Sequence, residues 1–118
     1  MADHLPILTI NDKDFQNQVI ESHLPVIVVF EKSFWGTAYI MKPIIEKLAT
    51  DYNNKIKFFK YNLEENTRIS DFYRIENSTT ILIFNKGNVI HKTGAISKGE
   101  LNEIIKSFFE DSFSNWTA

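Results

Sequence analysis

Short apolar runs recur along the chain, with polar or helix-favouring segments between them. The run Val26–Phe30 is unbroken and largely β-branched, which is typical of a strand covered on both faces. Strand character also occurs in four further segments, at residues 7–10, 56–63, 80–84 and 89–93. The segment Asn85-Lys86-Gly87-Asn88 predicts a tight turn, so we expect the last two strands to form a hairpin.

Apolar residues at helical spacing separate these strands. Four helices are expected, at residues 11–22, 38–52 and 67–72 and from residue 97 onward. Pro43 lies inside the second helix and should kink it, because proline removes one backbone hydrogen bond and crowds the preceding turn. Ser97 and Glu100 have the spacing of a capping box, which predicts where the last helix begins.

The last helix should bury one apolar stripe, made of Leu101, Ile104, Ile105, Phe108 and Phe109. The resulting order of elements is β-α-β-α-β-α-β-β-α. Strands that alternate with helices favour an α/β domain, with a mixed, mainly parallel sheet covered by helices on both faces.

Charge and length exclude several classes of function. The formal net charge is −2, from 13 basic and 15 acidic residues, and no basic stripe favours binding to nucleic acid. The longest uncharged apolar stretch, Leu24–Phe30, is too short to cross a membrane. The first residues lack the pattern of a signal peptide, so we expect a cytoplasmic protein. A chain of 118 residues suits one domain spanning residues 1–118.

Five segments of the sequence, in order, resemble one known family. They lie at residues 28–38, at Pro43, and at residues 60–64, 80–87 and 94–101. They are similar to the active-site strand and loop, the helix-kinking proline, the third strand, the Pro-Thr-x-x-x-Phe-x-x-Gly segment and the Gly-Ala segment of thioredoxin. The resemblance covers about residues 7–110. It implies the thioredoxin fold, a three-layer α/β/α arrangement with a central mixed sheet of about five strands and four helices.

The departures from the family pattern concern its chemistry. The chain has no cysteine, and the resemblance places Trp35 and Ala38 at the two cysteine positions. Val29 takes the place of the family's buried acid, which removes a buried charge that would no longer be useful. Thiol–disulfide exchange needs a thiolate and a resolving thiol. We therefore expect neither dithiol oxidoreductase activity nor a cofactor.

The resemblance implies a binding surface where the family has its active site. Its members are Phe34, Trp35, Gly36, Thr37, Ala38, Tyr39, Ser78, Thr79 and Gly94. We expect this former active-site groove to hold a protein or an extended peptide, so that the domain acts as an assembly factor, chaperone or regulator. Two alternatives remain: a family member classed with the reductases by resemblance alone, and an enzyme of another kind, such as a glutathione-dependent transferase.

Trp35 and Thr79 are the two positions of this surface for which the sequence makes structural predictions. Trp35 is either an exposed anchor for a partner or a packed core aromatic, and exposure is favoured. Thr79 stands where the family has a cis-proline. A non-prolyl cis bond costs about 2.5–4 kcal/mol, so the Ser78–Thr79 peptide should be trans, and Thr79 regains a backbone N–H that proline lacks.

Other residues offer weaker candidate chemistry. His4, His23 and His91 lack the spacing of metal ligands, so no metal site is expected. Glu64 and Glu65 are adjacent and favour a cluster of charges at a strand end rather than a catalytic pair. Residues 111–118 form a C-terminal extension beyond the family match. There Phe113 and Trp116 either extend the last helix or meet a partner.

Overall fold

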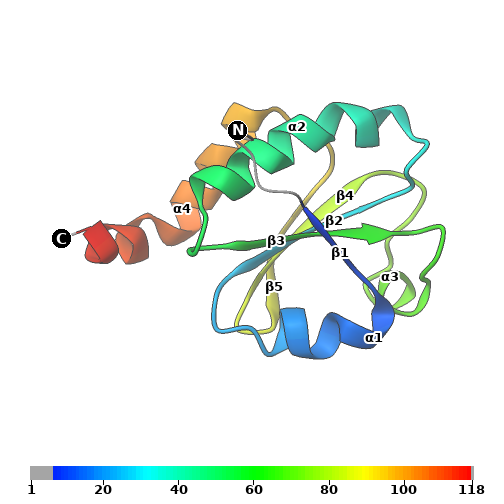
Figure 1. Ribbon diagram of the computed structural model, residues 1–118, viewed down its shortest axis with the longest axis horizontal. Helices are drawn as coiled ribbons and strands as arrows, with labels where there is room; N and C mark the ends of the chain where they lie inside the picture. The colour runs from blue at the N-terminus through cyan, green and yellow to red at the C-terminus, as the bar shows by residue number, and fades with distance from the viewer. Residues whose placement is uncertain (1–6, 118) are drawn as a thin grey trace.

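The computed structural model describes residues 7–117, with side chains described for residues 7–109. Its elements follow the predicted order (Figure 1). They are β1 (Leu8–Ile10), α1 (Asp12–Phe15), η1 (Gln16–Ile20), β2 (Val26–Glu31), α2 (Gly36–Asp51), β3 (Lys57–Asn62), α3 (Arg68–Phe72), β4 (Thr80–Asn85), β5 (Asn88–Thr93) and α4 (Lys98–Thr117).

The five strands form one mixed sheet in the order β1-β3-β2-β4-β5. Strand β3 runs parallel to β1 and to β2, whereas β4 runs antiparallel to both β2 and β5. The expectation of a mainly parallel sheet is therefore wrong, because two of these four pairings are antiparallel. The short helix α3 keeps the chain at the end of the sheet where β3 finishes, so β4 starts opposite the end of β2, with Thr80 beside Phe30.

Helices cover both faces of the sheet, as predicted (Figure 1). Consecutive residues of a strand point to opposite faces, and β2 shows this clearly. Ile27 and Val29 belong to the apolar cluster under α2 and α4, while Val28 and Phe30 belong to the cluster on the side of α1 and α3. Both sets are buried, which explains why the sequence of β2 is apolar without interruption and confirms the three-layer fold.

The predicted ends of helices and the predicted turn are largely confirmed. Ser97 Oγ accepts a hydrogen bond from the Glu100 N–H at 3.1 Å, and Glu100 accepts one from the Ser97 N–H at 3.2 Å. The hairpin turn places Lys86 and Gly87 at φ values of 52° and 83°, as a two-residue turn of this type requires. The first helix was predicted as one α-helix. It is an α-helix only as far as Phe15 and then continues as a π-helix, η1.

The predicted apolar stripe on α4 is wrong at one residue. Leu101, Ile105 and Phe109 are buried, whereas Phe108 is 44% exposed. The ring centroids of Phe108 and His91 of β5 lie 5.7 Å apart. Figure 1 shows the last turns of α4 extending past the sheet. Phe113 and Trp116 lie outside the described side chains.

Asp12 joins three elements near the end of the sheet that carries the candidate site. Its carboxylate accepts hydrogen bonds from the Tyr61 hydroxyl and from the backbone N–H groups of Thr67, Arg68 and Ile69, at 2.5–3.3 Å. Burial raises the pKa of Asp12, but these hydrogen bonds outweigh it and hold the pKa below its usual value. Burial and the same contact raise the pKa of Tyr61 to about 12. Asp12 thus fixes the start of α3, from which the chain leads to Ser78 and Thr79.

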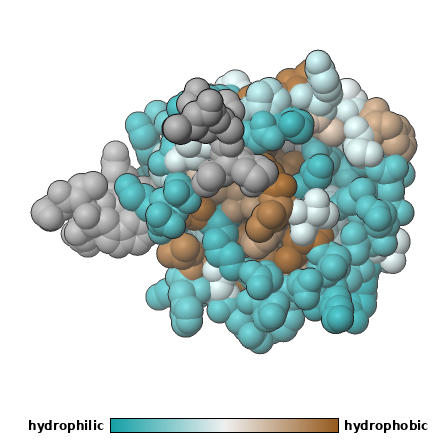
Figure 2. Space-filling view, in the orientation of Figure 1, coloured by the Kyte–Doolittle hydropathy of each residue, from teal (hydrophilic) through white to brown (hydrophobic). Residues whose placement is uncertain are grey.

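Figure 2 shows apolar residues gathered in the middle of one face, where the edge strand β1 lies in Figure 1, with hydrophilic residues around them. Leu8 of β1 is exposed. Within the part of the chain that is described, no helix is both long and apolar enough to cross a membrane.

Candidate functional site

Three chain segments converge at one end of the sheet. They are the loop between β2 and α2, the loop before β4, and the residues after β5. They meet because β4 begins opposite the end of β2, while β5 returns to the start of β4. An open groove lies between them, lined by Trp35, Gly36, Thr37, Ile40, Asn77, Ser78, Thr79, Gly94 and Ala95.

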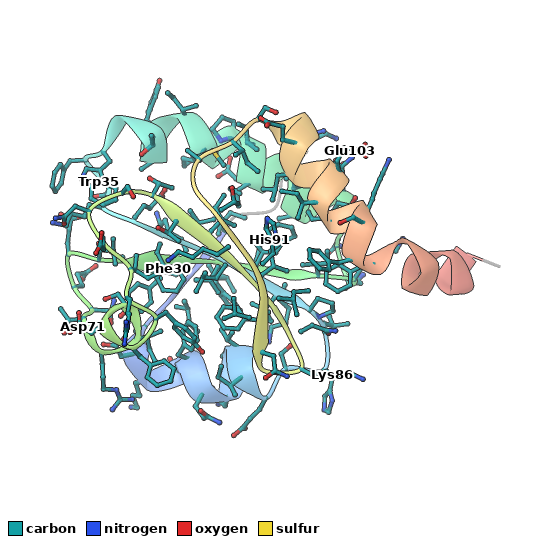
Figure 3. All side chains as sticks on the ribbon, turned by 180° about the vertical axis from the view of Figure 1, so that it is seen from behind. Phe30, Trp35, Asp71, Lys86, His91 and Glu103 are labelled. Atoms are coloured by element: carbon teal, nitrogen blue, oxygen red, sulfur yellow. The ribbon has the colours of Figure 1, made fainter. Side chains whose placement is uncertain are left out.

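Trp35 is half-buried, which lies between the two alternatives of an exposed anchor and a packed core residue. It is the N-cap residue of α2 and lies at the periphery of the fold in Figure 3. The loop turns back before it, with the Trp35 N–H bonded to the Lys32 carbonyl at 3.1 Å. The Lys32 ammonium therefore lies 5.9 Å from the indole centroid, and this cation–π contact covers part of the ring. Trp35 is neither a free anchor nor a core residue.

Three apolar side chains near Trp35 in the sequence are open to solvent. Phe34, Tyr39 and Ile40 are all exposed. Of the three, Ile40 lines the groove and Tyr39 lines a separate cavity. Exposed Ile40 therefore adds apolar contact area to the groove.

A pair of hydroxyls forms the floor of the groove. The oxygens of Thr37 and Thr79 lie 2.5 Å apart and share a hydrogen bond, which ties the first turn of α2 to the loop before β4. Thr79 is only 4% exposed. The described residues contain no cis peptide bond, so the prediction of a trans Ser78–Thr79 bond is confirmed.

A carboxylate from the turn after β3 fixes the loop that carries Phe34 and Trp35. Glu64 accepts hydrogen bonds from the Ser33 hydroxyl at 2.7 Å and from the Ser33 N–H at 3.0 Å. These bonds hold the pKa of Glu64 below its usual value. Glu65 accepts instead from the Asn62 amide at 2.9 Å. The two acids therefore have separate structural partners, as expected for residues that do not form a catalytic pair.

The structure brings together six of the nine predicted surface residues. Trp35, Gly36, Thr37, Ser78, Thr79 and Gly94 line the groove. Ala38 is buried, and with Tyr39 it lines a separate cavity under α2. Phe34 is exposed beside the groove and is not among the residues that line it.

Sequence reasoning missed three residues that line the groove. Ile40 lies four residues after Gly36, which places both on one face of α2. Asn77 and Ala95 adjoin Ser78 and Gly94 in the chain. Helical spacing and adjacency could have found all three.

A buried acid near Val29 was also missed. Glu31, at the end of β2, is 7% exposed and lines the cavity under α2 together with Val29. Val29 leaves no acid at its own position, but a buried carboxyl is present two residues further along the same strand. Strand alternation could have found it, since Ile27, Val29 and Glu31 share a face.

The comparison with known families agrees with this geometry. The family model described as Thioredoxin matches residues 6–107. The chain belongs to the thioredoxin family. The match ends three residues before the limit expected from the sequence and includes all of the groove.

Bacterial thioredoxins are among its relatives. The chain is 35% identical to "Thioredoxin" of Buchnera aphidicola subsp. Acyrthosiphon pisum over 100 residues, which cover 84% of this chain and 93% of that one. It is 32% identical to "Thioredoxin" of Acidithiobacillus ferridurans over 102 residues, covering 86% and 94%. For "Thioredoxin" of Rickettsia bellii the identity is 33% over 99 residues, covering 83% and 94%.

Within the thioredoxin family, the groove of this chain has a distinct chemistry. The chain has no cysteine, and the side chains that line the groove are aromatic, aliphatic, hydroxyl and amide groups, with no ionisable group among them. A thiolate nucleophile is therefore missing, and the hydroxyls of Thr37 and Thr79 are bonded to each other. What the groove retains is the capacity to pack against a ligand and to form hydrogen bonds.

Proposed function

We propose that this domain is a redox-inactive member of the thioredoxin family that binds an extended peptide or protein segment in the groove around Trp35, without catalysis. The observation that carries the proposal is the lining of the groove. An aromatic ring, two glycines and uncharged polar groups replace a dithiol there. Such a site can recognise a peptide but cannot form a mixed disulfide with it.

The position of the groove at the end of the sheet supports an extended ligand. Thr79 precedes the first residue of β4, and Gly94 follows the last residue of β5. Backbone groups just outside a sheet can pair with an extended chain, which gives affinity independent of the ligand's sequence. The indole of Trp35 and the exposed Ile40 would give the domain its preference among ligand sequences. In other peptide-binding domains, pockets for alternate side chains of the peptide have this role. An assembly factor, chaperone or regulator would use such binding.

Two glycines allow a matched test of this proposal. A Cβ on Gly94 would lie 3.7 Å from the Thr79 carbonyl oxygen, an ordinary contact, and a Cβ on Gly99 would meet nothing within 4 Å. Both residues are exposed, but only Gly94 lines the groove. Gly94→Arg should therefore fill the groove without preventing folding, and Gly99→Arg, at the start of α4, serves as the control.

The test uses peptides selected on the wild-type protein from a displayed library of random linear peptides. We expect selected peptides to bind the wild type and Gly99→Arg equally, to lose at least about tenfold in affinity for Gly94→Arg, and to be released without a reductant. Fluorescence anisotropy of labelled peptides measures these affinities. Equal binding to the two arginine variants, or failure to select any peptide, would contradict the proposal.

A further inference from the structure

A second cavity, separate from the groove, lies between α2 and the strands β2 and β3. Its volume is about 390 Å³, at the small end of the range for sites that bind small molecules. Val29, Met41 and Ile45 form an apolar wall, and all three are buried. The charged residues Glu31 and Lys60 also line it.

Glu31 lines this cavity and has one buried carboxyl oxygen without a hydrogen-bond partner among the described residues. Only 7% of the residue's surface is exposed. The buried oxygen without a partner is Oε1. Strand alternation directs it to the face of Val29, beneath α2. A buried carboxylate without a partner is strongly unfavourable, and burial raises the pKa of Glu31 even though the charge of Lys60 opposes this. A ligand that donates a hydrogen bond would remove this penalty.

Lys60 presents the complementary group. It lies on β3 in register with Val29, so its side chain shares the face of Glu31. Within residues 7–109, no ion pair or hydrogen bond links its ammonium to another residue. By contrast, Lys42 and Glu46 at the same cavity are paired with each other at 3.1 Å. The cavity therefore has an acid and a base whose charges act on each other without an ion pair or hydrogen bond between them among the described residues, and both lie beside an apolar wall.

We propose that this cavity binds a small zwitterion with an apolar side chain, of which a free apolar α-amino acid is the simplest example. Its ammonium group would donate to Glu31, its carboxylate would accept from Lys60, and its side chain would pack against Met41 and Ile45. A simple cation would leave Lys60 unpaired and a simple anion would leave Glu31 unpaired, so a ligand with both charges fits best. This inference does not depend on peptide binding in the groove.

The test is a titration of the isotope-labelled protein with L-leucine, followed by amide chemical shifts. We expect saturable shifts at Val29, Met41 and Lys60. Two analogues separate the charges: isoamylamine lacks the carboxylate, and isocaproate lacks the ammonium group. Each should bind at least about tenfold more weakly than leucine, as expected for the loss of a hydrogen bond to a charged group.

Variants assign each charge to its residue. Glu31→Gln should weaken leucine by about tenfold but leave isocaproate unchanged, whereas Lys60→Gln should weaken leucine and leave isoamylamine unchanged. Glu103→Gln, an exposed acid on α4 (Figure 3), is the control and should bind leucine normally. The proposal is overturned if leucine causes no saturable shifts at tens of millimolar, if its shifts map to the groove, or if leucine binds both variants as tightly as it binds the wild type.

Discussion

Replacing Trp35 and Ala38 together by cysteine is expected to create a domain that accelerates the reduction of insulin disulfides by dithiothreitol several-fold. Trp35 is the N-cap residue of α2 and Ala38 lies in its first turn, where the Ala38 N–H bonds the Trp35 carbonyl at 3.1 Å. Side chains three residues apart on a helix have Cβ atoms about 5–6 Å apart, close enough for small adjustments to form a disulfide. The helix N-terminus would lower the pKa of the first thiol. Insulin turbidity measures the rate.

The controls for this prediction are the wild type and the two single variants. The wild type has no thiol and should be no faster than dithiothreitol alone. Trp35→Cys or Ala38→Cys alone supplies one thiol without its resolving partner and should also fail. Acceleration by the wild type would refute the proposal that the domain is redox-inactive. A folded but inactive double variant would refute the view that the active-site loop keeps its family geometry.

Trp35→Ala is expected to weaken peptide binding far more than it weakens the fold. Truncation of a central tryptophan in a binding site typically costs at least about 2 kcal/mol, or roughly 30-fold in affinity. The half-buried ring loses its contact with Lys32, which is worth about 1 kcal/mol at such a site. The thermal midpoint should therefore fall by about 4 °C. Anisotropy and thermal unfolding measure the two effects.

Phe108→Ala is the matched control for Trp35→Ala. Phe108 is another partly exposed aromatic, but it lies on α4 against His91 and does not line the groove. Its loss should leave peptide affinity unchanged. If Trp35→Ala instead lowered the midpoint by well over 10 °C without changing affinity, Trp35 would be a core residue and the proposed site would lose its main contact.

Local patterns predicted the features whose causes are local. The apolar run of β2, the Ser97–Glu100 capping box and the hairpin at Gly87 depend on neighbouring residues alone, and the structure has all three. The direction of β4 was not predictable in this way. It depends on where α3 returns the chain, and that in turn depends on Asp12, more than fifty residues earlier.

The candidate site also has features that were predictable from the sequence and one that was not. Resemblance to thioredoxin pointed to Trp35, Thr37 and Thr79, and these residues do meet in one groove. The half-burial of Trp35 could not be read from the sequence, because it depends on how the loop folds back over Lys32. The burial of Glu31 was predictable from strand alternation, because Glu31 shares a face of β2 with the buried residue Val29.

The most direct test of the proposed function is to map where a library-selected peptide binds the wild-type protein, by amide chemical shifts during a titration. The proposal predicts that the largest shifts cluster at Trp35, Thr37, Ile40, Thr79 and Gly94, which line the groove, and that they saturate without any covalent bond. Largest shifts along the exposed edge strand β1 or along α4, with these five residues unchanged, would contradict it.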